Sequence, residues 1–152
     1  MSSIAHGTFV IERSYPVPPK RAFAAWSDTA QKARWFIGPE GWKLIERALD
    51  FRVGGDELLH GKYDAWETLF RARYHAIVPD QRIVYVYDMF VGGKHHSLSL
   101  ATVEFHPEGK GTKQVFTEQV AFLDGTAGPE GTASRERGTA AHLDRMAPLF
   151  SA

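Results

Sequence analysis

The chain begins with a strand pattern that is followed by two short helical patterns. Residues Thr8–Tyr15 are rich in β-branched and aromatic side chains, a composition typical of a strand. The prolines at positions 16, 18 and 19 end that strand, and proline is favoured in the first turn of a helix because its missing N–H would have no partner there. Apolar spacing then predicts helices over Lys20–Trp26 and Thr29–Phe36, the second capped by a side-chain oxygen of Ser27 or Asp28.

The middle of the chain, from Trp42 to Phe122, alternates between strand patterns and tight turns. Four turns that contain glycine or proline begin at Val53, Val78, Val91 and Glu108, and a further reversal is expected within residues 62–67. Parallel strands would need crossover helices, and this segment has no helical pattern to supply them. We therefore predict an antiparallel meander of about six strands.

The end of the chain contains one helical stripe. Residues 124–131 (DGTAGPEG) are glycine-rich and predict a loop, after which apolar positions recur at helical spacing. The stripe consists of Thr139, His142, Leu143, Met146, Leu149 and Phe150. One helix cannot bury such a stripe alone, and a long antiparallel sheet must bend to cover it. The predicted fold class is α+β, with a bent antiparallel sheet wrapped around a long C-terminal helix and two short helices after the first strand.

Composition and charge narrow the functional classes. The chain has 152 residues and 43% hydrophobic content, which suits one domain over residues 1–152. Its 18 Lys and Arg residues balance 18 Asp and Glu residues, so no electrostatic footprint for nucleic acid or anionic lipid is visible. The absence of cysteine excludes disulfides and thiolate chemistry. Without a signal pattern or a bilayer-spanning apolar stretch, we expect a soluble cytoplasmic protein with no membrane insertion.

Several segments resemble, in their order and spacing, the SRPBCC (START-like, helix-grip) superfamily. They are Tyr15–Trp26 (YPVPPKRAFAAW), Ala33–Pro39 (ARWFIGP), Leu49–Gly55 (LDFRVGG), Arg82–Tyr85 (RIVY), Gly111-Thr112 and Phe116–Gln119 (FTEQ). The resemblance runs from about Phe9 to Leu149 and is closest to the stand-alone bacterial branch related to the activator of the ninety-kilodalton heat-shock ATPase. Much of that branch has Gly-Trp near the start of the final helix, where this chain has Gly138-Thr139. We expect a neighbouring side chain to replace the packing of that tryptophan.

The resemblance implies a helix-grip domain with a cavity between the sheet and the C-terminal helix. It implies no particular reaction, because members of the superfamily include lipid carriers, hormone receptors, cyclases and co-chaperones. Aromatic rings give rigid apolar walls, and tyrosine hydroxyls can orient a ligand. The residues expected to line the cavity are Trp35, Phe36, Trp66, Phe70, Tyr74, Tyr85, Tyr87, Phe116, Glu118, His142 and Met146. Trp35 and Phe36 precede a Gly-Pro break and are candidates for a gate at the open end.

Strand parity leaves the direction of Glu118 open. One face of the strand over residues 114–122 holds Gln114, Phe116, Glu118, Val120 and Phe122. If this face points inward, the Glu118 carboxylate needs a partner or an unusual protonation state. A shift of one residue exchanges the two faces and places Glu118 in solvent. The pattern alone favours neither arrangement.

The histidines and acidic residues form no recognisable metal or catalytic motif. His95 and His96 are adjacent, so on a strand they point to opposite faces and cannot chelate one ion together. There is no nucleophile-elbow motif and no cysteine, and the Asp56-Glu57 pair is interpreted as the exit of a turn. We expect no metal and no cofactor.

These observations lead to a ranked set of functional hypotheses. The first is non-covalent binding of a small apolar or amphipathic molecule in the grip cavity. The second is a cyclase- or hydrolase-like enzyme that uses Glu118, a tyrosine or His142 for acid–base work, and the third is a co-chaperone-like protein-interaction module. Two or more titratable side chains that converge in one pocket would favour the enzyme. We also expect a homodimer, because residues 97–105 have apolar side chains on both faces and only one face can meet the helix.

Overall fold

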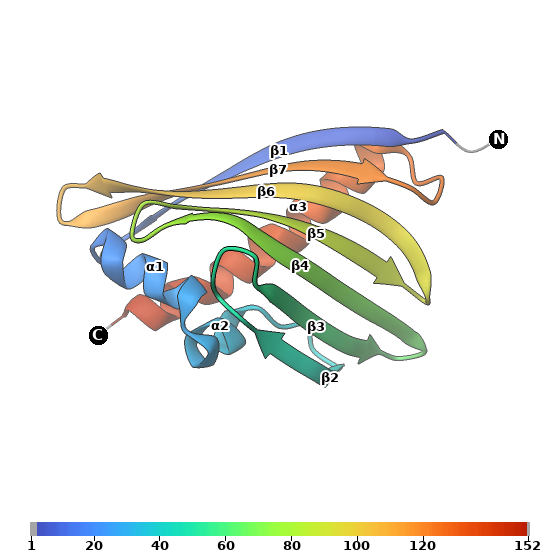
Figure 1. The fold of residues 1–152 in the computed structure, drawn as a ribbon, viewed down its shortest axis with the longest axis horizontal. Coiled ribbons are helices and arrows are strands. Elements are labelled where there is room, and N and C mark those ends of the chain that lie inside the picture. Colours follow the sequence, from blue (N-terminus) through green and yellow to red (C-terminus); the bar gives the residue numbers. More distant parts are fainter. Residues whose placement is uncertain (1–2, 152) are drawn as a thin grey trace.

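A single seven-stranded antiparallel sheet bends around one long helix, and two short helices lie at one end of that helix (Figure 1). The computed structural model describes residues 3–151. Along the sheet the strand order is β1-β7-β6-β5-β4-β3-β2. The strands are β1 (Ala5–Tyr15), β2 (Trp42–Leu49), β3 (Asp56–Tyr63), β4 (Trp66–Val78), β5 (Arg82–Val91), β6 (Lys94–Glu108) and β7 (Gly111–Phe122). The helices are α1 (Pro19–Ser27), α2 (Thr29–Trp35) and α3 (Gly128–Met146), followed by a 3-10 turn over Ala147–Phe150. The predicted fold class is confirmed.

The two short helices form where the sequence predicts them. Pro19 occupies the first turn of α1, where it costs no hydrogen bond. The Asp28 carboxylate caps α2, because its Oδ1 accepts hydrogen bonds from the backbone N–H groups of Ala30 (2.9 Å) and Gln31 (3.1 Å). Both helices turn their apolar side chains towards the sheet, where Trp26 and Trp35 are 2% exposed.

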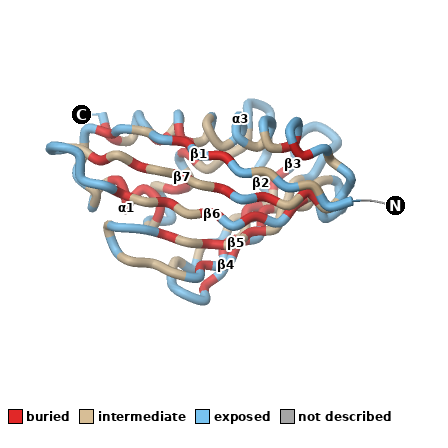
Figure 2. Tube along the Cα trace, turned by 90° about the horizontal axis from the view of Figure 1, so that it is seen from above, coloured by how far each residue is buried: buried red, intermediate tan, exposed pale blue. Residues whose placement is uncertain are grey.

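The meander from β2 to β7 is bent by irregularities in its ladder. Pairing shifts register between Leu44 and Glu46, between Tyr74 and Ala76, and between Met89 and Phe90. Bulges of this kind bend a strand and increase its twist. Along β5 and β7 buried residues alternate with less buried ones, so one face of the sheet is turned inward (Figure 2).

Helix α3 is longer than the sequence pattern indicates. It begins at Gly128, inside the segment predicted as a loop, because Pro129 and Glu130 suit the first turn of a helix. Its buried residues at the C-terminal end are Leu143 and Met146, as predicted from the stripe. None of the helices in the described part of the chain is long and apolar enough to cross a membrane.

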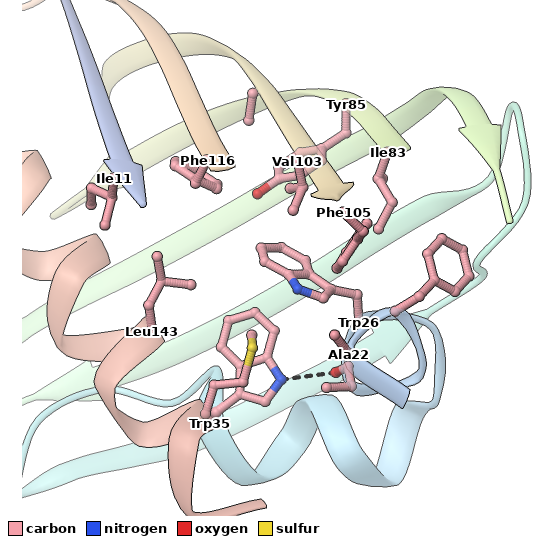
Figure 3. Close-up of a cluster of buried hydrophobic side chains, with 14 of the residues drawn as sticks. Ile11, Ala22, Trp26, Trp35, Ile83, Tyr85, Val103, Phe105, Phe116 and Leu143 are labelled. Atoms are coloured by element: carbon pink, nitrogen blue, oxygen red, sulfur yellow. Dashed lines mark hydrogen bonds between the residues drawn. The ribbon is translucent and has the colours of Figure 1, made fainter. Parts of the chain in front are cut away.

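A cluster of buried hydrophobic side chains lies where α1 and α2 meet the sheet (Figure 3). The rings of Trp26 and Trp35 pack edge to face with centroids 4.7 Å apart, and the Trp26 ring stacks on Phe116 at 6.3 Å. The Trp35 indole N–H donates a 2.8 Å hydrogen bond to the carbonyl of Ala25. This packing fills one end of the space between the sheet and α3, and the space along the middle of α3 stays open.

Candidate functional site

A cavity of about 420 Å³ lies between α3 and the inner face of the sheet. From the helix it is lined by Glu130, Gly131, Ser134, Arg135, Gly138, Thr139, His142 and Leu143, which recur every three or four residues along one stripe. The remaining wall consists of Trp26, Lys32, Trp35, Phe36, Phe70, Tyr85, Tyr87, Met89, His96, Phe116, Glu118 and Thr126. Half of the helix residues that line the cavity are therefore small (glycine, serine or threonine), and they face a wall that is mostly aromatic.

The space exists because the helical stripe is small at its centre. A Cβ atom added at Gly138 would meet no heavy atom of any described residue within 4 Å outside its own helix. Thr139 beside it also lines the cavity. The expectation that a neighbouring side chain takes the place of the missing tryptophan stays a prediction, because that tryptophan corresponds to Thr139 and not to Gly138.

Eight of the residues expected to line the cavity do so, and three others lie elsewhere. Trp35, Phe36, Phe70, Tyr85, Tyr87, Phe116, Glu118 and His142 line the cavity. Trp66 does not, because at the first position of β4 its side chain lies over Gly92 of the next hairpin and is 62% exposed. Tyr74 is buried behind the wall, where it contacts Lys32, and Met146 is 0% exposed in the core beyond the cavity. The placement of Trp66, Tyr74 and Met146 on the wall is thus corrected.

The two residues expected to form a gate behave differently. Trp35 is 2% exposed and is held by its hydrogen bond to the backbone of Ala25, so it is part of the packed core. Phe36 is half-buried, and its ring packs edge to face against Phe70 at 4.9 Å and against His142 at 5.2 Å. Phe36 is therefore a wall residue whose neighbours belong to β4 and α3.

The first polar cluster of the cavity is centred on Glu118, which points inward and is 1% exposed. Its Oε2 accepts hydrogen bonds from the Tyr87 hydroxyl (2.6 Å), the Ser99 hydroxyl (2.7 Å) and Nη1 of Arg135 (3.0 Å). Arg135 also donates from Nη2 to the Ser97 hydroxyl at 2.6 Å. Burial, and then the Glu118 carboxylate, raise the pKa of Tyr87 above its ordinary value, so the phenol keeps its proton.

The second oxygen of Glu118 is not paired. Glu118 Oε1 is buried and accepts no hydrogen bond from any described residue. Three donors converge on Oε2, so the carboxylate is firmly oriented while one of its oxygens is unsatisfied. A buried acceptor without a partner is unfavourable by about 1–3 kcal/mol and calls for a functional explanation.

A second polar cluster joins α2 to the sheet. Lys32 and Glu57 are each 2% exposed, and the Lys32 Nζ donates a 2.6 Å hydrogen bond to Oε1 of Glu57. The Tyr74 hydroxyl donates to the same oxygen at 2.6 Å. The Lys32 ammonium also lies 4.9 Å from the Phe36 ring centroid, within range of a cation–π interaction. Burial lowers the pKa of Lys32, and the neighbouring Glu57 opposes that shift.

Sequence reasoning missed three members of these clusters. Glu57 was interpreted as the exit of a turn, whereas it follows the first residue of β3 and points inward. Lys32 lies on a short helix whose apolar pattern draws no attention to it. Arg135 falls four residues before Thr139 and seven before His142, so it shares their stripe once the early start of α3 is known.

His142 and the acidic residues give no sign of a metal centre. Burial, and then the Arg145 guanidinium, lower the pKa of His142 to about 4, so its imidazole is neutral near pH 7. Within residues 3–151 no group of three or more His, Cys, Asp or Glu side chains is placed to hold a metal ion.

Comparison with solved structures finds close matches over nearly the whole chain. A crystal structure from Rhizobium loti is 43% identical, with a TM-score of 0.87 and coverage of 96% of this chain and 98% of that chain. A second structure, of an uncharacterised protein from Rhizobium leguminosarum, is also 43% identical, with a TM-score of 0.87 and coverage of 97% and 95%. A Staphylococcus aureus protein of unknown function, 16% identical with a TM-score of 0.79 and coverage of 97% and 95%, shares the fold. No curated protein matches significantly.

The family comparison agrees with the resemblance seen in the sequence. Residues 16–151 match the family described as "Activator of Hsp90 ATPase homolog 1-like protein". That range includes both short helices, the strands from β2 to β7 and the whole of α3. The chain belongs to this family, in the stand-alone bacterial branch of the SRPBCC superfamily, and has its helix-grip fold.

Proposed function

We propose that the protein binds a small apolar or amphipathic molecule, without covalent chemistry, in the cavity between the sheet and α3. The observation on which the proposal rests is the cavity itself. Its volume of about 420 Å³ falls within the range of about 300–1,000 Å³ that is usual for small-molecule sites. Aromatic rings from α1, from the end of α2 and from β4, β5 and β7 form a large part of its wall, and polar side chains lie among them.

The charges around the cavity support a ligand without net charge. Lys32 is paired with Glu57 and Arg135 is paired with Glu118, so each buried charge is balanced by a partner of opposite sign. An ion that entered this space would lose its hydration without gaining an unpaired counter-charge. A neutral molecule with an apolar body loses little hydration there and gains contact with the rings.

The enzyme hypothesis stands second, and a specific observation supports it. Titratable side chains converge within hydrogen-bond reach in both polar clusters, which is the feature expected of an acid–base site. General acid–base catalysis works best when the pKa lies near the operating pH. Burial instead raises the pKa of Tyr85 and Tyr87 and lowers the pKa of His142 to about 4, away from neutrality. Lys32, whose pKa burial lowers, is the group that an enzyme would use.

The binding proposal is tested by filling the cavity. Thr139 lines the space at the centre of α3, so Thr139→Trp should occupy the volume that a ligand needs. An apolar ligand at a hundredfold excess over its Kd should stabilise the wild type by about 2.7 kcal/mol. We expect that stabilisation to vanish in Thr139→Trp, measured by thermal unfolding with fatty acids, flat polycyclic aromatics and small polar metabolites.

A matched control uses the next exposed position of the same helix. Ala141 is exposed and does not line the cavity, so Ala141→Trp should leave ligand stabilisation unchanged. Stabilisation that is equal in Thr139→Trp would contradict the proposed site. Stabilisation of the wild type by none of the compounds, with no small molecule retained in a native mass spectrum, would contradict the function.

We also propose that the protein forms a homodimer through the outer face of the sheet. On β6 the inward residues are Ser97, Ser99, Ala101, Val103 and Phe105, so the leucines between them point outward. Leu98 is 40% exposed and Leu100 is 38% exposed, and Val10 on β1 is 52% exposed on the same outer face. A second copy of the chain would bury these side chains.

A further inference from the structure

The geometry points to a polar subsite at the end of the cavity near the start of α3: we infer that His96, oriented by Asp124, accepts a hydrogen bond through Nε2 from a neutral hydroxyl group of the ligand. This inference rests on the proposed function and names the class of ligand, an amphipathic alcohol, that the same cavity takes. His96 lines the cavity, and its Nδ1 lies 2.6 Å from Oδ2 of Asp124. Asp124 lies in the loop that joins β7 to α3 (Figure 1).

A β-bulge brings His96 to the cavity. Ser97 points inward, so strict alternation along β6 would turn His96 outward. The pairing of β5 with β6 shifts register between Met89 and Phe90 and leaves His96 without a partner on β5. Such a bulge re-aims a side chain, and the His96 ring lies 5.4 Å from the ring of Phe122, which is 0% exposed. His96 therefore joins the cavity wall although alternation would place it on the other face.

The hydrogen bonds of Asp124 fix the tautomer of His96. Oδ1 of Asp124 accepts from the backbone N–H of Thr126 at 3.2 Å and from its hydroxyl at 2.7 Å. The bond from the Thr126 hydroxyl, and then the bond from His96, lower the pKa of the Asp124 carboxyl to about 2, so at neutral pH it is ionised and can only accept. The proton between the two side chains therefore belongs to Nδ1 of His96. In the neutral imidazole Nε2 then carries no proton and is an acceptor.

The Nε2 atom of His96 is accessible, and it makes no hydrogen bond to a described residue. The His96 side chain is 22% exposed. In the described part of the chain the polar side-chain atoms that are enclosed and without a partner are Gln114 Nε2, Glu118 Oε1 and Thr132 Oγ1, and His96 Nε2 is not among them. Asp124 is not part of the cavity wall, whereas His96 is, so the edge of the ring away from Asp124 faces the cavity. That edge carries Nε2.

The charges near His96 favour a neutral head group on the ligand. Asp124 is ionised, and the Glu130 carboxylate also lines the cavity, so an anionic head group would be repelled. An ammonium group would gain little, since Asp124 is already engaged by Thr126 and His96, and Glu130 is exposed to solvent. A hydroxyl group donates to His96 without a charge of its own, and its apolar body can contact the aromatic wall.

Probes that differ only in their head group test the donor. 2-(Hydroxymethyl)naphthalene can donate, whereas 2-(methoxymethyl)naphthalene can only accept. Calorimetry at about pH 8, above the usual range of histidine protonation, gives the Kd of each. For the wild type we expect the alcohol to bind about fivefold more tightly than the ether, the effect of one hydrogen bond. The cation 2-(aminomethyl)naphthalene should bind more weakly than the alcohol.

The outcomes separate the inference from the proposed function. Equal affinities for the alcohol and the ether, or tighter binding of the amine, would overturn the inference and leave the proposed function standing. Binding of none of the three probes would count against both.

His96→Phe removes the acceptor and keeps a ring against Phe122. We expect the preference for the alcohol to disappear in this variant. His95 provides a matched control, because its Nε2 lies 2.7 Å from Oδ1 of Asp88 and it does not line the cavity. His95→Phe should keep the wild-type preference. A preference that is retained in His96→Phe, or lost in His95→Phe, would overturn the assignment of the subsite to His96.

Asp124→Asn tests the positioning role of the carboxylate. The asparagine oxygen must keep the hydrogen bonds from Thr126, so its NH₂ group faces Nδ1 of His96 and donates to it. The imidazole proton then lies on Nε2, which becomes a donor. We expect the variant to lose the preference for the alcohol, and the ring nitrogen resonances of His96 to show the exchanged tautomer. An unchanged tautomer or an unchanged preference would contradict this role of Asp124.

The nitrogen resonances of the wild type cover the case in which a variant does not fold. At about pH 8 the free protein should show a protonated Nδ1 and an unprotonated Nε2 in His96. The bound alcohol should shift the Nε2 resonance, and the ether should leave it in place. A proton on Nε2 in the free protein, or an Nε2 resonance that the bound alcohol does not move, would overturn the inference.

Discussion

The charged side chains of Lys32 and Glu57 are buried among aromatic rings, where each charge needs the other as a partner. Lys32 is enclosed by aromatic rings, with Phe36 at 4.9 Å and Trp26 at 5.4 Å, and its direct ionic partner is Glu57 at 2.6 Å. Taking both charges out of water is costly, and their attraction offsets that cost only while both are present. The pair therefore fixes α2 against β3 rather than adding much to the overall stability.

Removing one partner of the Lys32–Glu57 pair should lower the free energy of unfolding far more than replacing both partners. We expect Lys32→Met to lower the free energy of unfolding by about 3–5 kcal/mol, because Glu57 is left as an uncompensated buried charge. The double variant Lys32→Met/Glu57→Gln should recover most of that loss, since glutamine still accepts from the Tyr74 hydroxyl. Urea unfolding measures the free energy of unfolding of both variants.

The exposed pair on the neighbouring strands provides the control. Arg73 and Asp56 are also hydrogen-bonded, at 2.9 Å, but both side chains are 60% exposed. Asp56→Asn should change the urea midpoint much less than Lys32→Met, because solvent screens that pair. A double variant as unstable as Lys32→Met would show that the pair itself is not the source of the loss.

The sequence predicts which residues of a strand share a face, but it does not predict which distant residues they contact. The alternation in β7 correctly groups Gln114, Phe116 and Glu118 on one face, yet only the packed sheet decides that this face is inward. Lys32 and Glu57 are 25 residues apart, and Arg135 and Glu118 are 17 apart. Such contacts arise from the folded topology, so no local pattern could have indicated them.

Among the elements, α3 contains both the clearest success and the clearest error of the sequence analysis. The stripe that includes Leu143 and Met146 is buried as predicted. The helix start was missed because the glycines at 128 and 131 resemble a loop, although Pro129 between them is well suited to a first helical turn. The strands were easier to predict, since most of them are bounded by turns that contain glycine or proline.

Two glycines of α3 should respond in opposite ways to the same substitution. Gly138 has open space at its Cβ position among the described residues, so Gly138→Ala should stabilise the protein by about 0.5–1 kcal/mol through helix propensity. At Gly131 a Cβ would lie 2.7 Å from Thr126 and 2.8 Å from the buried Phe122 ring. Gly131→Ala should therefore destabilise by about 1–3 kcal/mol.

Thermal unfolding of the two alanine variants side by side is the measurement. Because both positions lie in the interior of α3, the gain in helix propensity is shared and the difference reports the local space. Destabilisation by Gly138→Ala would show that the volume beside it is occupied, and the cavity would have to be redrawn.

In the whole molecule, the order of elements was enough to predict a sheet that grips one helix. The order follows from turns and from one helical stripe, and both are local signals. The volume between them was not predictable, because it depends on three bulges and on the small residues of α3 meeting a curved wall. The resemblance to a cavity-forming superfamily supplied what the pattern could not.

The outer face of the same sheet leads to the last prediction. Leu98 and Leu100 are 40% and 38% exposed, and the register places Leu100 opposite Gln119 of β7 and Val86 of β5. A symmetric pair of such faces would bury the leucines of both copies. Sedimentation at micromolar concentration should therefore show a species of twice the 17.0 kDa monomer mass. Leu98→Lys/Leu100→Lys should give the monomer with an unchanged unfolding transition of the fold, because both side chains point away from the core. A wild type that sediments only at 17.0 kDa would exclude the dimer, and a variant that stays dimeric would place the interface on another face.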